Sequence, residues 1–95
     1  MDNSRVKLAE HVRTFADRDG AILMDIRAGQ YYSVNAVGSL ICSALVNGSS
    51  DRELAAMIAT EYSLAASAAE SDTNAFLGML RSHQLVEALP AGGAR

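Results

Sequence analysis

The hydrophobic pattern is most informative between residues 21 and 45, where the sequence reads AILMDIRAGQYYSVNAVGSLICSAL. Residues 22–26 are short, apolar and bounded by turn residues, which favours a strand over a helix. Residues 27–29 follow, with glycine at the position where a three-residue hairpin needs a left-handed φ angle. Residues 30–34 contain two adjacent tyrosines and a β-branched valine, which are typical of a strand. This stretch therefore predicts a β-hairpin.

A helix is predicted directly after the hairpin, over residues 36–46. Asn35 ends the second strand and is a suitable N-cap, because its side chain can accept a hydrogen bond from a free backbone N–H in the first turn. Apolar residues then recur at the three- and four-residue spacing of a buried helix face, at Val37, Leu40, Ile41, Ala44 and Leu45. Gly48 stands where a helix end favours a residue with positive φ.

Two further helices are predicted from their capping signals. Ser50 and Glu53 have the spacing of a capping box, in which each side chain accepts a hydrogen bond from a free backbone N–H near the other. They start a second helix of about twelve residues with an apolar stripe. Ser67 and Glu70 offer a second capping box, so the third helix is expected over residues 68–82.

The remaining segments complete the predicted domain. An irregular edge strand is expected around residues 9–15, and residues 85–87 read as a short extended piece. The predicted boundaries are a flexible N-terminus over residues 1–8, one domain over residues 9–88 and a flexible tail over residues 89–95. The expected fold class is α+β, with one three-stranded antiparallel sheet followed by three helices.

The third predicted helix has an unusually wide apolar arc of roughly 160°. Its members are Ala69, Thr73, Phe76, Leu77, Met79, Leu80 and His83. One interpretation is that this helix packs against both other helices and the sheet. The alternative is that one edge of the arc, formed by Leu77 or Met79 together with His83, faces a groove.

Composition and charge narrow the class of protein. The chain has 95 residues, of which 49% are hydrophobic and 20% charged, as expected for a single globular domain. No apolar run approaches the roughly 20 residues of a membrane-spanning helix, and the first residues lack the apolar segment of a secretory signal. The single cysteine excludes an internal disulfide and fits a reducing, cytoplasmic environment.

The residues that usually carry catalysis or bind metals are scattered. His11 and His83 are far apart, and Cys42 lies inside the first predicted helix, where it is expected to be an inert core residue. These residues lack the compact spacing of a zinc site, and the carboxylates lack a paired spacing for acid–base catalysis. We therefore expect a protein that is not an enzyme and that holds no metal or cofactor.

The charge distribution disfavours nucleic acid and membrane partners. Three helices with a small sheet also fit a winged helix-turn-helix, whose DNA-binding form needs basic residues on the helix that enters the groove. The net charge is −3, and the last two predicted helices contain only Arg52 and Arg81 among five acidic residues. A winged-helix regulator therefore remains an alternative that the charge disfavours.

Peptide binding to a sheet edge is the class that remains. Residues 30–34 form a candidate exposed edge, to which a guest segment can add as a further strand. The pleat places Tyr32 and Val34 on one face and Tyr31 and Ser33 on the other. Val34 is expected in the core, whereas the tyrosine that meets the guest is left open.

The order and spacing of these residues resemble the PqqD-like family of RiPP recognition elements, in particular the stand-alone B1 proteins of lasso peptide biosynthesis. The resemblance covers about residues 20–87. The residues that match the family pattern are Asp25, Gly29, Tyr32, Val34, Asn35, Gly38, Gly48, Tyr62, Asp72, Phe76, Leu77, Leu80, Leu85 and Val86. Two positions depart from the family pattern. Val34 replaces the usual leucine, and Cys42 stands where a tryptophan is common.

The resemblance implies a winged helix-turn-helix-like domain that binds the leader of a ribosomally synthesised precursor peptide. In that family the leader adds as a strand beside the third strand and lies against the third helix. Carried over, the peptide-binding residues are Gln30, Tyr31, Tyr32, Ser33, Val34, Asp72, Phe76, Leu77, Met79, Leu80 and His83. Asp72 would pair with a basic leader residue or accept a bond from a leader hydroxyl. The alternative is an acid that simply favours the start of its helix.

The partners implied by the resemblance are the leader region, a separate cysteine leader peptidase and a cyclase that forms the ring. A PqqD-type role in pyrroloquinoline quinone biosynthesis would use the same peptide-binding step with a different precursor. The sequence does not separate these two pathways, nor does it give the leader sequence or the oligomeric state. A dimer formed by exchange of the edge strand is also open.

Overall fold

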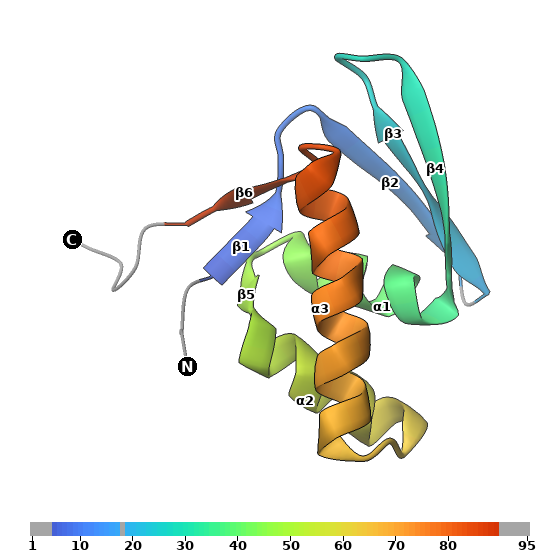
Figure 1. Cartoon of the computed structure of the whole chain (residues 1–95). Helices are drawn as coiled ribbons and strands as arrows, with labels where there is room; N and C mark the ends of the chain where they lie inside the picture. Colours follow the sequence, from blue (N-terminus) through green and yellow to red (C-terminus); the bar gives the residue numbers. More distant parts are fainter. Residues whose placement is uncertain (1–4, 18, 90–95) are drawn as a thin grey trace.

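The computed structural model describes residues 5–17 and 19–89 (Figure 1). The elements follow the order β1 (Arg5–Leu8), β2 (Val12–Asp17), β3 (Gly20–Asp25), β4 (Gln30–Asn35), α1 (Ala36–Leu45), β5 (Ser49–Ser50), α2 (Asp51–Tyr62), α3 (Ala66–Ser82) and β6 (Val86–Ala88). The α+β class is confirmed, and the expected sheet and three helices are present.

The strands form two antiparallel sheets, whereas the sequence predicted one. The first sheet has the order β2-β3-β4 and contains the predicted hairpin, with Met24 opposite Tyr31 and Ile22 opposite Ser33. The turn of this hairpin places Gly29 at φ 71°, as its glycine predicted. The second sheet has the order β5-β1-β6 and joins three segments that are distant in sequence.

The prediction of a flexible N-terminus is wrong for residues 5–8, which form β1. Val6 and Leu8 are buried in this strand, and the Arg5 guanidinium donates to Glu53 Oε1 at 2.9 Å and to the Gly48 carbonyl at 2.7 Å. The apolar burial and the paired backbone outweigh the polar character of the segment. The expected strand over residues 9–15 begins three residues later, as β2, because residues 9–11 form a turn closed by Val12 N–H and the Ala9 carbonyl.

The C-terminal extended piece is confirmed as β6. It pairs with β1, so that Leu8 lies opposite Val86, and the N–H of Leu89 donates to the carbonyl of Arg5 at 2.8 Å. The prediction of a flexible tail is therefore wrong at Leu89, and residues 90–95 lie outside the described part of the chain, as do residues 1–4.

Two of the three predicted helix caps are confirmed. Asn35 accepts a hydrogen bond from Gly38 N–H at 3.0 Å, and Ser50 and Glu53 form the capping box at the start of α2. The third prediction is wrong, because α3 begins at Ala66 with Ala65 as a cap that has no side-chain hydrogen bond. Ser67 thus lies inside the first turn, past the position from which a hydroxyl caps a helix.

The core lies between the helices and the inner face of the first sheet. α1 packs against all three strands of that sheet, and α2 packs against α3. Burial raises the pKa of the Cys42 thiol to about 12, which keeps it un-ionised at neutral pH and agrees with the predicted inert core residue.

Candidate functional site

The β4 strand is the outer strand of the first sheet, since β3 is its neighbour on one side and the sheet order ends with it. Its side chains alternate as the pleat predicted. Tyr32 and Val34 are half-buried and pack against the core, whereas Tyr31 and Ser33 are exposed. The backbone of β4 therefore offers a sheet edge to which another strand can be added.

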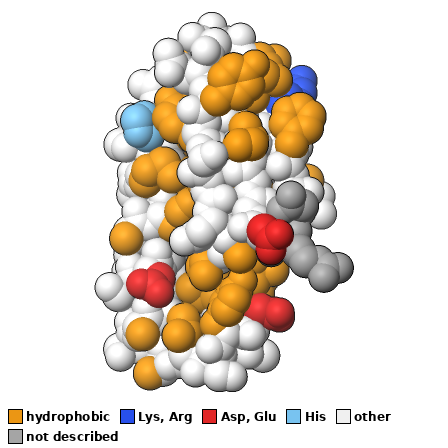
Figure 2. All heavy atoms as spheres, turned by 90° about the vertical axis from the view of Figure 1, so that its right-hand side faces the viewer, with side chains coloured by type: hydrophobic (Ala, Val, Ile, Leu, Met, Phe, Trp, Pro, Cys, Tyr) orange, Lys and Arg blue, Asp and Glu red, His pale blue; other side chains and the backbone are white. Residues whose placement is uncertain are grey.

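A groove of about 440 Å³ lies between the end of β4, the start of α1 and one side of α3. Its lining residues are Asn35, Val37, Gly38, Asp72, Ala75, Phe76 and Met79. Three of them, Asp72, Phe76 and Met79, are predicted peptide contacts. Figure 2 views the molecule from the right-hand side of Figure 1, and hydrophobic side chains gather along this face with isolated charged ones between them.

A contact between the first turn of α1 and the Phe76 side chain of α3 borders the groove. A Cβ atom on Gly38 would lie 2.8 Å from Phe76 Cε1 and 2.9 Å from Val34 Cβ, which is too close for any side chain. The missing side chain at residue 38 thus allows the Phe76 ring to lie against the first turn of α1. The sequence signalled Gly38 as part of the family pattern, but not its contact with Phe76.

An aromatic pair links β4 to the C-terminal end of α3. The ring centroids of Tyr32 and His83 are 4.8 Å apart, and the tyrosine hydroxyl lies 3.5 Å from His83 Nδ1. Tyr32 therefore faces α3, while Tyr31 faces away from it. This contact gives the orientation of the two tyrosines and does not test which of them meets a guest peptide.

Leu77 and Leu80 lie in the core and not in the groove. Both side chains are completely buried, so a bound peptide would not reach them without rearrangement of the helix. The sequence offered Leu77 or Met79 as the edge of the α3 arc that faces a groove. Met79 lines the groove and Leu77 does not. Leu77 and Leu80 fix α3 against the core and thereby support the groove from beneath.

Asp72 gives the groove a negative charge. It lies one turn before Phe76 on α3, its side chain is exposed, and no Lys or Arg of the described residues forms an ion pair with it. A carboxylate in this position attracts a cationic or hydrogen-bond-donating group of a ligand.

Polar residues at the far end of the hairpin hold the turn in place. Asp25 is buried, and its carboxylate accepts hydrogen bonds from the backbone N–H groups of Arg27 at 3.0 Å and Ala28 at 3.1 Å. His11 Nε2 lies 2.9 Å from the Gln84 carbonyl and links the β1–β2 connection to the end of α3. The Arg27 guanidinium also donates to Gln84 Oε1 at 3.4 Å, which connects the turn of the β3–β4 hairpin to the residues that follow α3.

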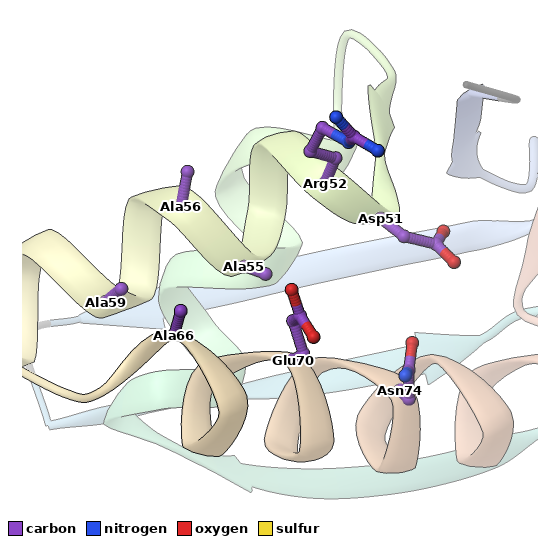
Figure 3. Close-up of a pocket in the computed structure, with 8 residues that line it drawn as sticks. All are labelled: Asp51, Arg52, Ala55, Ala56, Ala59, Ala66, Glu70 and Asn74. Carbon is purple, nitrogen blue, oxygen red and sulfur yellow. The ribbon is translucent and has the colours of Figure 1, made fainter. Parts of the chain in front are cut away.

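A second hollow of about 310 Å³ lies between α2 and α3 (Figure 3). Four alanines and the side chains of Asp51, Arg52, Glu70 and Asn74 line it. Figure 3 shows Glu70 and Asn74 pointing from α3 toward α2. The hollow forms because small side chains face each other across the two helices. It does not border the β4 edge.

The described residues contain no group of three or more His, Cys, Asp or Glu side chains that could hold a metal ion. Within the same part of the chain, no helix combines the length and apolar character needed to cross a bilayer.

Comparison with known proteins gives the family. The sequence pattern of coenzyme PQQ synthesis protein D (PqqD) matches residues 20–86. No curated protein matches the chain significantly. Two solved structures are similar. "TbiB1 in Complex with the TbiA(beta) Leader Peptide" is 31% identical, with a TM-score of 0.78, over 94% of this chain and 99% of that one. "Lasso peptide synthetase B1 complexed with the leader peptide" is 28% identical, with a TM-score of 0.73, over 90% of this chain and 98% of that one. With most of its length matched, this chain belongs to the PqqD family.

Proposed function

We propose that the protein binds the leader segment of a ribosomally synthesised precursor peptide in lasso peptide biosynthesis. The observation that carries the proposal is the position of the groove, which joins the end of the outer strand β4 to α3. Two similar proteins, TbiB1 and a lasso peptide synthetase B1, are known in complex with leader peptides.

In this proposal the leader adds as a strand along β4 and lies against α3. Tyr31 and Ser33 contribute backbone N–H and carbonyl groups, which give affinity with little dependence on sequence, whereas Gln30 pairs with Asp25 on β3. Apolar leader side chains enter the groove over Phe76 and Met79, where their burial contributes about 25 cal/mol for each Å² removed from water.

The charged and polar groups at the groove give the leader its register. Asp72 pairs with a basic or hydroxyl-bearing leader residue at one end, and the Tyr32–His83 pair borders the other end. Val34 lies beneath the edge, and Leu77 and Leu80 act only by holding α3. The direct side-chain contacts are therefore fewer than the sequence predicted.

The protein acts in this pathway without catalysing a step. It delivers the bound leader to a separate cysteine leader peptidase, and a cyclase then closes the ring. Holding the precursor close to these enzymes raises its effective concentration at their active sites. This role places the protein in the cytoplasm, where precursor peptides are made, and its sheet and helices would serve as a winged helix-turn-helix-like scaffold.

Amide hydrogen exchange with and without a synthetic leader tests the proposal. The expected result is protection of the β4 amides over residues 30–35, together with slower exchange in α3 around residues 72–83. Binding without protection of β4 would rule out strand addition at this edge. Absence of binding to any lasso leader, with binding to a duplex DNA, would instead favour the winged-helix regulator.

The family match favours a second candidate, a role in pyrroloquinoline quinone biosynthesis. The peptide-binding step is the same, and only the precursor differs. Titration with leaders of both classes separates the two, because the correct precursor should bind at least about tenfold more tightly.

A further inference from the structure

Three apolar side chains lie beside the free edge of β4, on the outer face of the first sheet. Tyr31 is 68% exposed and Ile22 38% exposed, and Met24 is half-buried. Met24 lies opposite Tyr31, and Ile22 lies opposite Ser33. These four residues, which we call the outer patch, occupy two successive outward positions on each of β3 and β4. Ser33 is the small member and leaves Ile22 open toward the edge.

The outer patch is additional to the core of the domain. The buried Ala21 and Leu23 alternate with Ile22 along β3, and α1 covers the inner face of the sheet (Figure 1). An antiparallel sheet that packs on one side usually places polar residues on the other. Neighbouring exposed apolar residues on the open side therefore indicate a surface that contacts another molecule.

The backbone of β4 indicates which molecule reaches the outer patch. Gln30 pairs with Asp25 at the closed end of the hairpin, and hydrogen bonds alternate along an antiparallel pair, so Tyr31 and Ser33 turn their backbone groups to the free edge. Residues directly opposite each other in a sheet share a face. A leader residue bonded beside Ser33 therefore directs its side chain to the outer face. The outer patch is thus continuous with the proposed leader strand.

The spacing of the strands determines which leader side chain fits. Neighbouring strands lie about 4.8 Å apart, so the leader residue beside Ser33 lies roughly 10 Å from Ile22, two strands away. Only a large side chain crosses Ser33 to contact Ile22, and it would also lie beside the Tyr31 ring. Arg13 also faces outward, but it lies opposite Met24 on β2, on the far side of the sheet from the leader. A charged leader side chain would therefore lose water over the outer patch without gaining a partner.

We infer that the outer patch selects leaders that carry a large apolar side chain, either aliphatic or aromatic, beside Ser33. This inference rests on the proposed leader binding and adds a specificity to it. The leader is then recognised on both faces of its strand. Its inward side chains enter the groove over Phe76 and Met79, and one outward side chain covers Ile22. The recognised segment therefore has apolar residues at successive positions and not only at alternate ones.

A matched pair of full-length variants tests the inference. Ile22→Thr and Phe15→Thr each remove an exposed apolar side chain from the same face, and threonine keeps a high strand propensity. Phe15 lies opposite Ile22 on β2, one strand further from the leader, and is the control. The probes are fluorescein-labelled leader peptides of the two similar complexes, that of TbiB1 and that of the lasso peptide synthetase B1. By fluorescence anisotropy, Ile22→Thr should weaken binding about three- to tenfold, and Phe15→Thr should stay within about twofold.

A second measurement uses the unaltered protein with labelled isoleucine methyl groups. In the complex, the Ile22 methyl groups should show nuclear Overhauser effects to one large apolar leader side chain. Replacing that leader residue by serine should weaken binding of the wild type about as much as Ile22→Thr does. The same replacement should have little further effect on binding to Ile22→Thr, because the two changes remove one contact.

A bound leader without a nuclear Overhauser effect to Ile22 would overturn the inference. Equal losses of affinity in Ile22→Thr and Phe15→Thr would do the same, as would strictly additive effects of the protein and leader changes. A wild-type dimer that Ile22→Thr dissociates, observed by sedimentation, would place a second copy on the outer patch and likewise overturn it. Failure of the proposed function is distinguishable, because the wild-type protein would then bind neither leader.

Discussion

Tyr32 on β4 and His83 at the end of α3 stack with their ring centroids 4.8 Å apart, so the edge strand and the helix meet through one aromatic pair. The tyrosine hydroxyl lies 3.5 Å from His83 Nδ1, which is the limit of a hydrogen bond. The ring contact therefore contributes more to this junction than the hydroxyl does.

Replacing Tyr32 separates these two contributions. Tyr32→Phe keeps the ring and should leave leader affinity within about twofold of the wild type, because only a marginal hydrogen bond is lost. Tyr32→Ala removes the ring and should weaken leader binding by about tenfold or more. Titration calorimetry on variants that circular dichroism shows to be folded checks both. Equal losses in the two variants would mean that the hydroxyl, and not the ring, contacts the leader.

Phe76 and Leu77 are neighbours on α3, but replacing Phe76 should weaken leader binding, whereas replacing Leu77 should lower the stability of the fold. Phe76→Ala removes a side chain that lines the groove and should weaken leader binding by about tenfold. Leu77→Ala removes a completely buried side chain and should lower the free energy of unfolding by about 2–5 kcal/mol, with leader affinity of the folded protein unchanged. Urea denaturation and calorimetry on each variant provide the two measurements. A folded Leu77→Ala protein that has lost leader binding would place residue 77 in the site.

Gly38 and Gly78 provide a matched pair of substitutions, because Gly38 lies against the Phe76 ring and Gly78 does not contact another element. Gly38→Ala places a methyl group 2.8 Å from Phe76 Cε1, so it should lower the free energy of unfolding by about 1–3 kcal/mol and reduce leader affinity. Gly78→Ala meets nothing within 4 Å on an exposed turn of α3 and should raise the free energy of unfolding by about 0.5–1 kcal/mol. Thermal or urea unfolding of both variants checks that the two changes in the free energy of unfolding have opposite signs. A harmless Gly38→Ala would contradict the close packing of α1 on Phe76.

Asp72 should make leader binding sensitive to salt. Asp72→Asn is expected to reduce affinity for a leader with a basic residue by about three- to tenfold, and to flatten the dependence of affinity on ionic strength. Glu70→Gln, two residues earlier and facing the α2–α3 hollow, is the control that should leave both quantities unchanged. An identical effect of the two changes would indicate general electrostatics and not a contact at residue 72.

The capping box of α2 makes part of the stability depend on pH. The Ser50 backbone N–H bonds the Glu53 carboxylate and, with Arg5, holds its pKa below the ordinary value of 4.5. Because the folded pKa is lowered, this stabilisation is complete above the ordinary value and is lost as the pH falls through the folded pKa.

Glu53→Gln should therefore be less stable than the wild type near neutral pH, with the difference shrinking as the pH falls below 4.5. Urea denaturation of both proteins at the two ends of this range measures the difference. A gap that stays constant with pH would show that the charge of residue 53 has no part in the cap.

Local signals predicted the hairpin, the Asn35 cap and the Ser50–Glu53 capping box, because each depends on residues within a few positions of one another. The second sheet was missed because its strands are short, one of them of two residues, and pair only through distant contacts. The periodicity of α3 identified an apolar arc, but it did not show which part of that arc other elements of the fold would cover. Met79 and Leu77 are both apolar, and only the positions of β4 and α1 decide which of them faces the groove.

The pairing of β1 with β6 also sets an order in which the protein can fold. Val6 pairs with Ala88, so this contact forms only after almost the entire described chain has been synthesised. The β3–β4 hairpin can form much earlier, since Asp25 and Gln30 pair across a short turn. Contacts between such distant segments slow folding, because a long loop must be closed first. The edge that receives the leader can thus exist on the ribosome before the sheet that joins the two ends of the domain.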